Sequence, residues 1–593
     1  MTSTLKQPSR TRAHPWNARD IWCAVAGAVS LALAVGSAAT VAVPVNSDLG
    51  LVAVLPYPFW VGVLIVNVAF VVALRGDATG PARRPVMLWL IAVLVLMLFG
   101  AAAFVTDVPR GEVAFRHLGI ADALSTSGGV DPNIDAYFNW PGFFALLATV
   151  LRATGIDPVT VALWAPVFNM GLWLTAVGVL ARYLTKDPRR RWLVLWIFCL
   201  GNWQDQDYLS PQAFGFFLYL VVIVLLMGPL AAKAPTFPGF KRAGLKSWWQ
   251  ARTPADDRPG HRVGALVVTL LLIAVICASH QLTPFLVLIA VTALTLSGRV
   301  WPGRLPLIIG ILLVLWLVYP ASTYLSGHPP LADAGLQTAI EANVVDRTTG
   351  SAGHVLVVQI RIALTLILWA LATIGSIRDW RRGRLDIRVV LLAVTPLLLF
   401  PVQAYGGEML IRVSLFALPF IAVQASSVLL PTTGGLRLSS RNAVVLVPAC
   451  VLLAVMTVTG RFGNAQYDVF ADDEIAAVQA VDNLAPPGSA IISAAHPTPW
   501  RSQDYLDHRY RTIEDLCPSD LSAATCGPLV YRYAKHNPGG GYLLLMSSAE
   551  SSLVLQGQTT PRSFEELENW LKAQDGVDLA FSNSDARVYR VAP

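Results

Sequence analysis

Long apolar runs alternate with short polar segments over most of the chain, up to about residue 460. About thirteen of these runs approach the roughly 20 residues that a helix needs to cross a bilayer. They lie near 20–43, 51–74, 86–105, 158–182, 191–207, 213–230, 263–279, 282–298, 305–324, 355–377, 388–403, 409–430 and 443–459. The pattern predicts an all-α polytopic membrane protein, with a transmembrane domain over 20–459.

Two of the segments between the predicted spans are long. The first, 106–157, contains WPGFFALLATVLRATG at 140–155, which is apolar but too short to cross. Pro141 suits the first turn of a helix, so we expect an amphipathic helix at the outer membrane interface. A short tilted span is the alternative. The second segment, 325–354, is polar and Gly-rich at TTGSAGH, and we expect a mobile lid there.

The pattern changes after residue 460. DDEIAAVQAVDNL and SFEELENWLKAQ have helical spacing and acidic first turns. SAIISAA, GYLLLMSS, VDLAF and ARVYRV have the length and composition of short strands. Residues 460–593 are therefore predicted to form a small soluble α/β domain. Cys517 and Cys526 fall in this domain, where we expect them to form a disulfide.

Composition excludes a soluble protein, because 55% of the residues are hydrophobic and 14% are charged, against about 25% charged in soluble domains. Assigning the loops alternately to the two sides gives one side 28 lysines and arginines and the other side, before residue 460, five. Basic loops stay in the cytoplasm. We therefore expect a multi-pass plasma-membrane protein with a cytoplasmic basic leader, 1–19, and an extracytoplasmic domain, 460–593. The net charge of +7 is explained by this topology and implies no nucleic acid.

Ionisable residues in or beside membrane spans are costly, and they suggest function by default. In this chain they gather at the outer ends of the predicted spans. They are, in order, Asp107, Asp205, Asp207, His280, Arg361, Glu408 and Arg412. Carboxylates can act as general bases or hold a divalent cation, and arginines bind phosphate through two donors. This combination suits a lipid-phosphate substrate, with glycosyl transfer from a polyprenyl-phosphate sugar as the chemistry. Membrane lipids would surround it.

Two sequence stretches carry a family resemblance. In TDVPRGEVAFRHLGIADALSTSGGVDPNIDAYFNWPGFFALLATVL an acid directly follows a span, and a helical stretch and an aromatic-Pro interface helix come next. WQDQDYLSP supplies a second acidic motif at the outer end of a later span. Over about 86–230 this layout resembles the type C (GT-C) integral membrane glycosyltransferases. These include protein mannosyltransferases, aminoarabinose transferases and the catalytic subunit of oligosaccharyltransferase.

The resemblance implies a GT-C fold and transfer of a hexosyl or pentosyl group. The donor would be a polyprenyl-phosphate sugar, and the acceptor an envelope glycan, lipid or protein. Asp107 is the first candidate for the catalytic base, although Val108 follows it where the family often has a second acid. Glu112 is therefore the alternative, and Asp122, Asp131 and Asp135 stay open.

Asp205 and Asp207 would shape the site or hold a metal, Mg²⁺ or Mn²⁺, although no cofactor is certain. The predicted substrate-binding residues are Arg412, Arg361, His280, Glu408, Arg116 and His117.

Plainer structural roles are open for several of these residues. Asp205 and Asp207 could cap the helix that begins near Ser210-Pro211. Arg412 could pair with Glu408 one turn away, and Arg361 could extend to the membrane surface. Two other functions also fit a charged outer cavity. One is a secondary transporter or flippase of a lipid-linked or anionic substrate, but the paired halves of such proteins are not evident. The other is a non-catalytic cell-envelope assembly protein.

Overall fold

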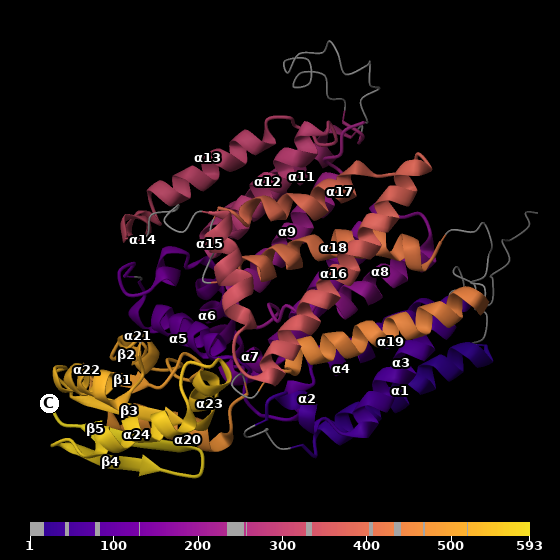
Figure 1. The fold of residues 1–593 in the computed structure, drawn as a ribbon. Coiled ribbons are helices and arrows are strands. Elements are labelled where there is room, and N and C mark those ends of the chain that lie inside the picture. Colours follow the sequence, from indigo (N-terminus) through magenta and orange to yellow (C-terminus); the bar gives the residue numbers. More distant parts are fainter. Residues whose placement is uncertain are drawn as a thin grey trace, which may run out of the picture.

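The computed structural model consists of a helical region followed by a small sheet domain (Figure 1). It describes residues 17–41, 47–76, 83–129, 131–233, 254–256, 258–327, 335–402, 407–431, 440–465, 469–518 and 520–593. Most of the predicted basic leader and most of the basic loop 231–262 lie outside these residues.

Helices make up most of the described residues between 18 and 462. The α-helices are α1 (Ala18–Ala38), α2 (Leu51–Val54), α3 (Tyr57–Arg75), α4 (Arg83–Phe99), α5 (Glu112–Ser127), α6 (Gly142–Thr154), α7 (Pro158–Leu184), α8 (Pro188–Gly201), α9 (Pro211–Met227), α11 (Pro259–Ser279), α12 (Thr283–Leu296), α13 (Leu305–Val318), α14 (Ser322–Gly327), α15 (Leu336–Ile340), α16 (Ala352–Arg381), α17 (Ile387–Val394), α18 (Met409–Leu429) and α19 (Ser440–Phe462). Short 3-10 or π turns are η1 (Ala102–Phe104), η2 (Ala136–Asn139), η3 (Glu341–Val345), η4 (Asp346–Thr348) and η5 (Thr395–Leu399). Every predicted span contains one of these helices.

Length and composition allow seven of the described helices to cross a membrane: Ala18–Ala38, Tyr57–Arg75, Pro158–Leu184, Pro259–Ser279, Ala352–Arg381, Met409–Leu429 and Asn442–Phe462. Shorter apolar helices accompany them, among them Pro211–Met227 and Thr283–Leu296. The predicted all-α polytopic architecture is confirmed, whereas the number of thirteen spans stays a prediction.

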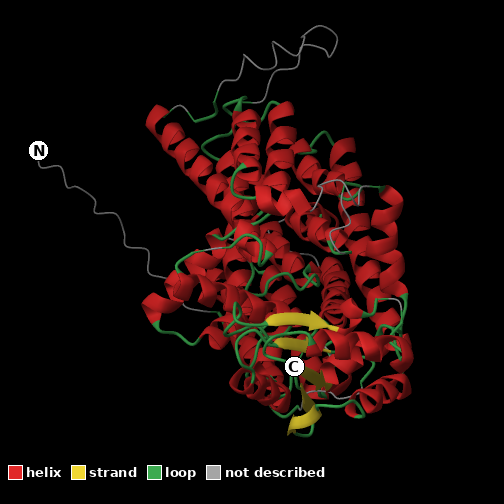
Figure 2. Cartoon of the chain, turned by 90° about the vertical axis from the view of Figure 1, so that its left-hand side faces the viewer, coloured by secondary structure: helices red, strands yellow, loops and turns green. Residues whose placement is uncertain are grey.

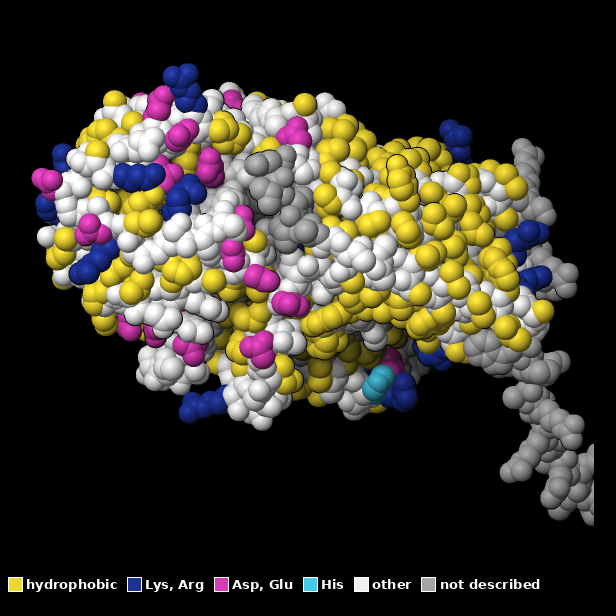
Figure 3. Space-filling view, turned by 90° about the horizontal axis from the view of Figure 1, so that it is seen from below, with side chains coloured by type: hydrophobic (Ala, Val, Ile, Leu, Met, Phe, Trp, Pro, Cys, Tyr) yellow, Lys and Arg dark blue, Asp and Glu magenta, His cyan; other side chains and the backbone are white. Residues whose placement is uncertain are grey.

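The surface of the helical region is apolar where a soluble protein would be polar. On α11, for example, Val263, Val267 and Leu271 follow one another at intervals of four residues and are 55%, 51% and 62% exposed. Figure 3 shows a nearly continuous hydrophobic surface over the helices, whereas charged side chains gather over the sheet domain. Such a surface is stable against lipid chains and unfavourable in water. Helix α18 lies at the centre, because almost all of its side chains are buried.

A helix, α6, is present where the interface helix is predicted, and its position at a membrane interface stays a prediction. It follows Pro141 and buries Phe143, Phe144 and Leu147, while Leu146 and Val150 on its other face are exposed. The predicted lid, 325–354, is largely helical where it is described, with α14, α15, η3 and η4 in sequence.

The C-terminal domain is built on one five-stranded sheet in the order β2-β1-β3-β5-β4. Its strands are β1 (Ala490–Ser493), β2 (Arg509–Thr512), β3 (Gly541–Met546), β4 (Val577–Ser582) and β5 (Ala586–Val591). Strand β1 pairs in parallel with β2 and β3, and β5 pairs antiparallel with β3 and β4. Its helices are α20 (Asp472–Leu484), α21 (Ile513–Leu516), α22 (Ala523–Lys535), α23 (Ser547–Leu555) and α24 (Pro561–Lys572).

The predicted strands and helices of this domain are all present, and the sequence pattern missed β2, α21, α22 and α23. Cys517 and Cys526 form a disulfide with their Cα atoms 5.6 Å apart. The domain buries its own hydrophobic core, separate from that of the helical region. Figure 2 shows its sheet at one end of the helical bundle.

The contacts that attach this domain to the helical region include the following three. Tyr505 donates a hydrogen bond to the buried carboxylate of Asp135, which precedes η2. The backbone N–H of Ser351 donates to the carbonyl of Leu555 at 2.8 Å. Phe470 packs edge-on against Phe115 of α5, with ring centroids 5.8 Å apart. The domain therefore contacts both α5 and the start of α16, which contribute to the cavity described next.

Candidate active site

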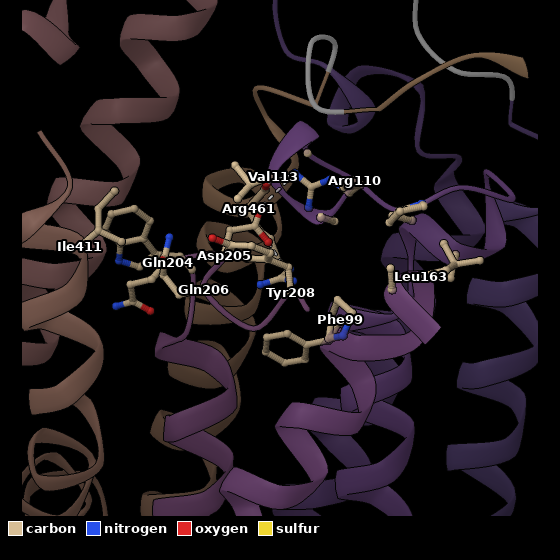
Figure 4. A pocket seen from close by; sticks show the side chains of 18 of the residues that line it. Phe99, Arg110, Val113, Leu163, Gln204, Asp205, Gln206, Tyr208, Ile411 and Arg461 are labelled. Carbon is tan, nitrogen blue, oxygen red and sulfur yellow. Dashed lines mark hydrogen bonds and ion pairs between the residues drawn. The ribbon is translucent and has the colours of Figure 1, made fainter. Parts of the chain in front are cut away.

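A cavity of about 300 Å³ lies at the end of the helical bundle that faces the C-terminal domain. Its walls come from the α4–α5 segment, α7, the loop between α8 and α9, η4, α16, α18 and α19 (Figure 4). The polar or charged residues that line it include Arg110, Gln204, Asp205, Gln206, Tyr208, Arg347, Arg361, Glu408 and Arg461. Segments far apart in the sequence therefore meet here.

The loop 202–210 carries the two aspartates of WQDQDYLSP. Asp205 adopts a backbone φ of 56°, in the left-handed region that aspartate tolerates better than most residues. Helix α9 is capped by the Ser210 hydroxyl, which accepts a hydrogen bond from Ala213 N at 3.0 Å. Helix capping therefore does not explain either aspartate.

Asp205 lines the cavity and is held by two arginines. One carboxylate oxygen lies 3.2 Å from Arg110 Nη2, and the other lies 2.9 Å from Arg461 Nη2. Its side chain is still 34% exposed. A ligand in the cavity can therefore reach this carboxylate.

Asp207 lies behind this layer and is completely buried. Its Oδ1 accepts a hydrogen bond from Arg461 Nη2 at 2.7 Å, and its backbone carbonyl accepts one from Asn169. The Arg461 side chain is only 2% exposed, so its charge is balanced by Asp205 and Asp207 rather than by water. Its Nε and Nη1 atoms have no hydrogen-bond partner among the described residues.

The two aspartates differ in acidity. Burial raises the pKa of Asp205, but Arg110, Arg461 and Arg361 together lower it more, so its net pKa lies below the ordinary value. Burial also raises the pKa of Asp207, and the single neighbour Arg461 does not offset this, so that pKa lies above the ordinary value. Asp205 is therefore the carboxylate that is ionised and accessible.

Two further arginines complete a positive wall. Arg361 Nε donates to the carbonyl of Gly460 at 2.6 Å, and its guanidinium lies 5.6 Å from the centre of the Trp203 ring. Arg347 also lines the cavity, and no carboxylate of the described residues pairs with it. With Arg110 and Arg461 there are four lining arginines, against the two lining carboxylates Asp205 and Glu408. The wall therefore has an excess of positive charge.

Arg412 lies behind this wall. It is 8% exposed and donates to Glu408 and to Gln212. Glu408 lines the cavity and Arg412 does not. The predicted pairing of the two residues along α18 is present.

Three other sequence candidates are engaged in packing. His117 is buried, with Nδ1 2.7 Å from the carbonyl of Leu209, and burial lowers its pKa to about 4. His280 Nδ1 lies 2.8 Å from Thr283 Oγ1 at the start of α12, and burial lowers its pKa well below the ordinary value. Arg116 pairs with Asp135. None of the three lines the cavity.

The two candidates for the base in the first outer loop also lie outside the lining. Asp107 is exposed to solvent, two residues before the lining residue Pro109. Glu112 begins α5 on the side of the C-terminal domain, where burial raises its pKa and the charges of His496 and Arg501 lower it. Of the remaining open acids, Asp122 and Asp131 line no part of the cavity and Asp135 is paired.

Asp205, Gln206 and Asp207 form a DxD motif, two aspartates separated by one residue. The two carboxylates do not have the arrangement of a resident metal site. The described ranges contain no group of three or more His, Cys, Asp or Glu side chains that could hold a metal ion. Between the carboxylates of Asp205 and Asp207 lies the buried guanidinium of Arg461, where a bridging cation would need to bind. These residues do not fit Mg²⁺ or Mn²⁺ in this arrangement.

Sequence reasoning missed Arg110, Arg347 and Arg461, and also Gln204 and Gln206. A usable signal existed for Arg461, because an arginine at the outer end of the last apolar run follows the same rule that selected Arg361. Gln204 and Gln206 alternate with the aspartates in WQDQDY. The sequence does not indicate that they line the cavity, because this depends on which side of the loop faces it.

No protein-family model matches the chain, and no curated protein matches it in sequence. Similar solved structures include ArnT from Cupriavidus metallidurans bound to undecaprenyl phosphate, with 12% identity and a TM-score of 0.48 over 86% of this chain and 98% of that one. Another is the Archaeoglobus fulgidus oligosaccharyltransferase in complex with Zn and sulfate, with 10% identity and a TM-score of 0.47 over 89% of this chain and 73% of that one. The same archaeal enzyme, AglB, with an inhibitory peptide and a dolichol-phosphate, gives 9% identity and a TM-score of 0.45.

Proposed function

We propose that this chain is a membrane glycosyltransferase that moves a sugar from a polyprenyl-phosphate donor to an extracytoplasmic envelope glycan, lipid or protein. The single observation that carries the proposal is the cavity, which is lined by four arginines and by the accessible carboxylate of Asp205. Each part of that cavity corresponds to one part of such a substrate.

The arginines suit the phosphate of the donor. A phosphodiester carries one negative charge, and guanidinium groups bind its oxygens through paired N–H donors. Among the described residues, two N–H-bearing atoms of Arg461 have no hydrogen-bond partner, and Arg347 has no carboxylate partner. Apolar residues also line the cavity, including Phe99, Ala102, Leu163 and Pro166, and they suit the lipid chain.

Asp205 is our candidate for the general base. It would take the proton of the acceptor hydroxyl while the acceptor oxygen forms a bond to the anomeric carbon. The bond between that carbon and the phosphate oxygen breaks, and its electron pair stays on the phosphate. The arginines stabilise the charge that develops on the leaving polyprenyl phosphate.

Asp107 and Glu112 are the alternative bases. Asp205 is placed before them because it lines the cavity and they do not. Arg361 and Glu408 are proposed to contact substrate, and Asp207, Arg412, Arg116, His117 and His280 are proposed to support the lining residues. The basic loops support an N-terminus in the cytoplasm, which would leave the cavity and the C-terminal domain outside the plasma membrane.

The test is transfer of radiolabelled sugar from polyprenyl phosphate into the envelope fraction of cells that contain wild-type or variant chain. Asp205→Asn should lower transfer at least about 100-fold, whereas the matched Asp107→Asn should lower it less than about threefold. The reverse order would move the base to Asp107. Movement of the labelled lipid across the membrane without sugar transfer would reject the proposal in favour of a transporter.

A further inference from the structure

Two buried glutamines line the cavity on either side of Asp205 in the sequence. Gln204 is 5% exposed and Gln206 is 7% exposed, and both belong to the cavity wall. Within the described residues, neither side-chain amide donates or accepts a hydrogen bond, and both Oε1 atoms are buried. A buried amide without a partner lowers stability, so this arrangement suggests a ligand that supplies the missing bonds.

Neighbouring amides that do not line the cavity each make at least one hydrogen bond, although Gln212 Nε2 and Asn202 Oδ1 are also buried without a partner among the described residues. Asn169 Nδ2 donates to the carbonyl of Asp207 at 2.8 Å, and Gln212 Oε1 accepts from Arg412. Gln204 and Gln206 differ from them in facing the cavity. They also differ in that neither end of the side-chain amide forms a hydrogen bond within the described residues.

The chemistry of an amide differs from that of the surrounding arginines. A guanidinium only donates hydrogen bonds, which suits phosphate oxygens, whereas an amide offers both a donor and an acceptor. A sugar hydroxyl also donates and accepts, so it pairs with either end of a glutamine side chain. The match holds whichever way each amide is turned.

The amides also lie apart from part of the positive wall. In Figure 4, Gln204 and Gln206 lie on the same side of Asp205 as Ile411, and Arg110 lies on the other side. Glu408, a further hydrogen-bond acceptor, lines the cavity near Ile411 on α18. The two amides and Arg110 therefore lie on different sides of Asp205 in the cavity.

We infer that Gln204 and Gln206 bind the hydroxyl groups of the donor sugar and so contribute to the choice of sugar. The inference rests on the proposed function, because it takes the phosphate to lie against the arginines. The glutamines would distinguish a glycosylated lipid phosphate from the same lipid without a sugar.

The test measures binding to the purified full chain in lipid nanodiscs. The probes are undecaprenyl phosphate and two glycosylated forms of it, one carrying a neutral hexose and the other a neutral pentose. The wild type should bind at least one glycosylated probe more tightly than the sugar-free lipid. The double variant Gln204→Met and Gln206→Met, which keeps side-chain volume without hydrogen bonds, should lose about tenfold in affinity for that probe and less than about twofold for undecaprenyl phosphate.

Gln424→Met is the matched control, because Gln424 is 5% exposed on α18 and does not line the cavity. It should leave all affinities unchanged. The inference is overturned if the wild type binds no glycosylated probe more tightly than undecaprenyl phosphate, or if the double variant keeps the preference or weakens all probes equally. Binding of undecaprenyl phosphate with no preference for sugar would reject only this inference. Failure of the wild type to bind any of the lipids would reject the proposed function as well.

Discussion

Arg461, at the end of α19, holds Asp205, in the loop after α8, through a contact of 2.9 Å between Nη2 and Oδ1. The same nitrogen lies 2.7 Å from Asp207, so one guanidinium joins both aspartates of the DxD motif to the last helix of the membrane region. Arg461 thus keeps the loop 202–210 against the bundle and balances a buried carboxylate. Both roles lead to measurable consequences.

Replacing this guanidinium should destabilise the fold. Arg461→Gln leaves Asp207 buried without a cation, and breaking a buried ion pair costs about 3–5 kcal/mol. Thermal unfolding of the full chain in detergent would measure the loss. Arg562→Gln is the control, because Arg562 is 89% exposed and pairs only with Glu566, so its removal should cost less than about 1 kcal/mol. Equal unfolding temperatures for wild type and Arg461→Gln would contradict the structural role.

Arg347 should contribute to the binding of the lipid phosphate and not to the stability of the fold. Arg347→Gln removes a lining cation that no described carboxylate pairs with. We expect affinity for undecaprenyl phosphate to fall about five- to tenfold, the loss of one charge-assisted contact, with an unchanged unfolding temperature. Arg382→Gln, at the exposed far end of α16, should change neither quantity. Undiminished lipid binding by Arg347→Gln would place the phosphate elsewhere.

The attachment of the C-terminal domain should depend on Tyr505. Its hydroxyl donates to the buried carboxylate of Asp135, which Arg116 also contacts. Tyr505→Phe removes a hydrogen bond to a charged group, worth about 1.5–3 kcal/mol. Amide hydrogen exchange in α5 should rise as the two parts separate more often. Tyr531→Phe, whose hydroxyl donates to a carbonyl at the exposed surface of the same domain, should leave exchange in α5 unchanged.

The stability of the C-terminal domain should rise as the pH falls from 7 to 5. Burial raises the pKa of Asp482 to about 6, and the charge of Asp504 adds to the rise. The folded state then binds a proton more tightly than the unfolded state, whose aspartates titrate near 3.9. The domain therefore loses on the order of 2 kcal/mol of stability as the pH rises from about 4 to about 6, and little more above that. Asp482→Asn should unfold at a higher temperature than wild type at pH 7, and this difference in unfolding temperature should shrink as the pH falls toward about 4.

Asp578→Asn, on the exposed side of β4, is the control for that experiment. This variant should show the same difference in unfolding temperature between pH 7 and pH 5 as the wild type. If Asp482→Asn retained the full pH dependence, another group would be responsible.

Much of the architecture could be read from the sequence because it depends on local properties. A run of about 20 apolar residues forms a helix in lipid whatever its neighbours are, since the backbone must satisfy its own hydrogen bonds there. For this reason every predicted span contains a helix, and Asp205 and Asp207 were correctly expected in a loop at a span end. The strands β1, β3, β4 and β5 followed from equally local patterns.

The composition of the cavity required the packed structure. The rotation of α19 decides whether Arg461 faces inward. The packing of helices that are distant in sequence decides which residues of WQDQDY face the cavity. The sequence indicates how deep a residue lies along a predicted span, and on this basis Asp107, His280 and Arg412 were expected at the level of the aspartates. It does not indicate which way each side chain points around the helix axis. The side chain of Asp107 points to solvent, and those of His280 and Arg412 point into the bundle. Arg110, Arg347 and Arg461 line the cavity instead. Only the assembled helices determine the direction of each side chain.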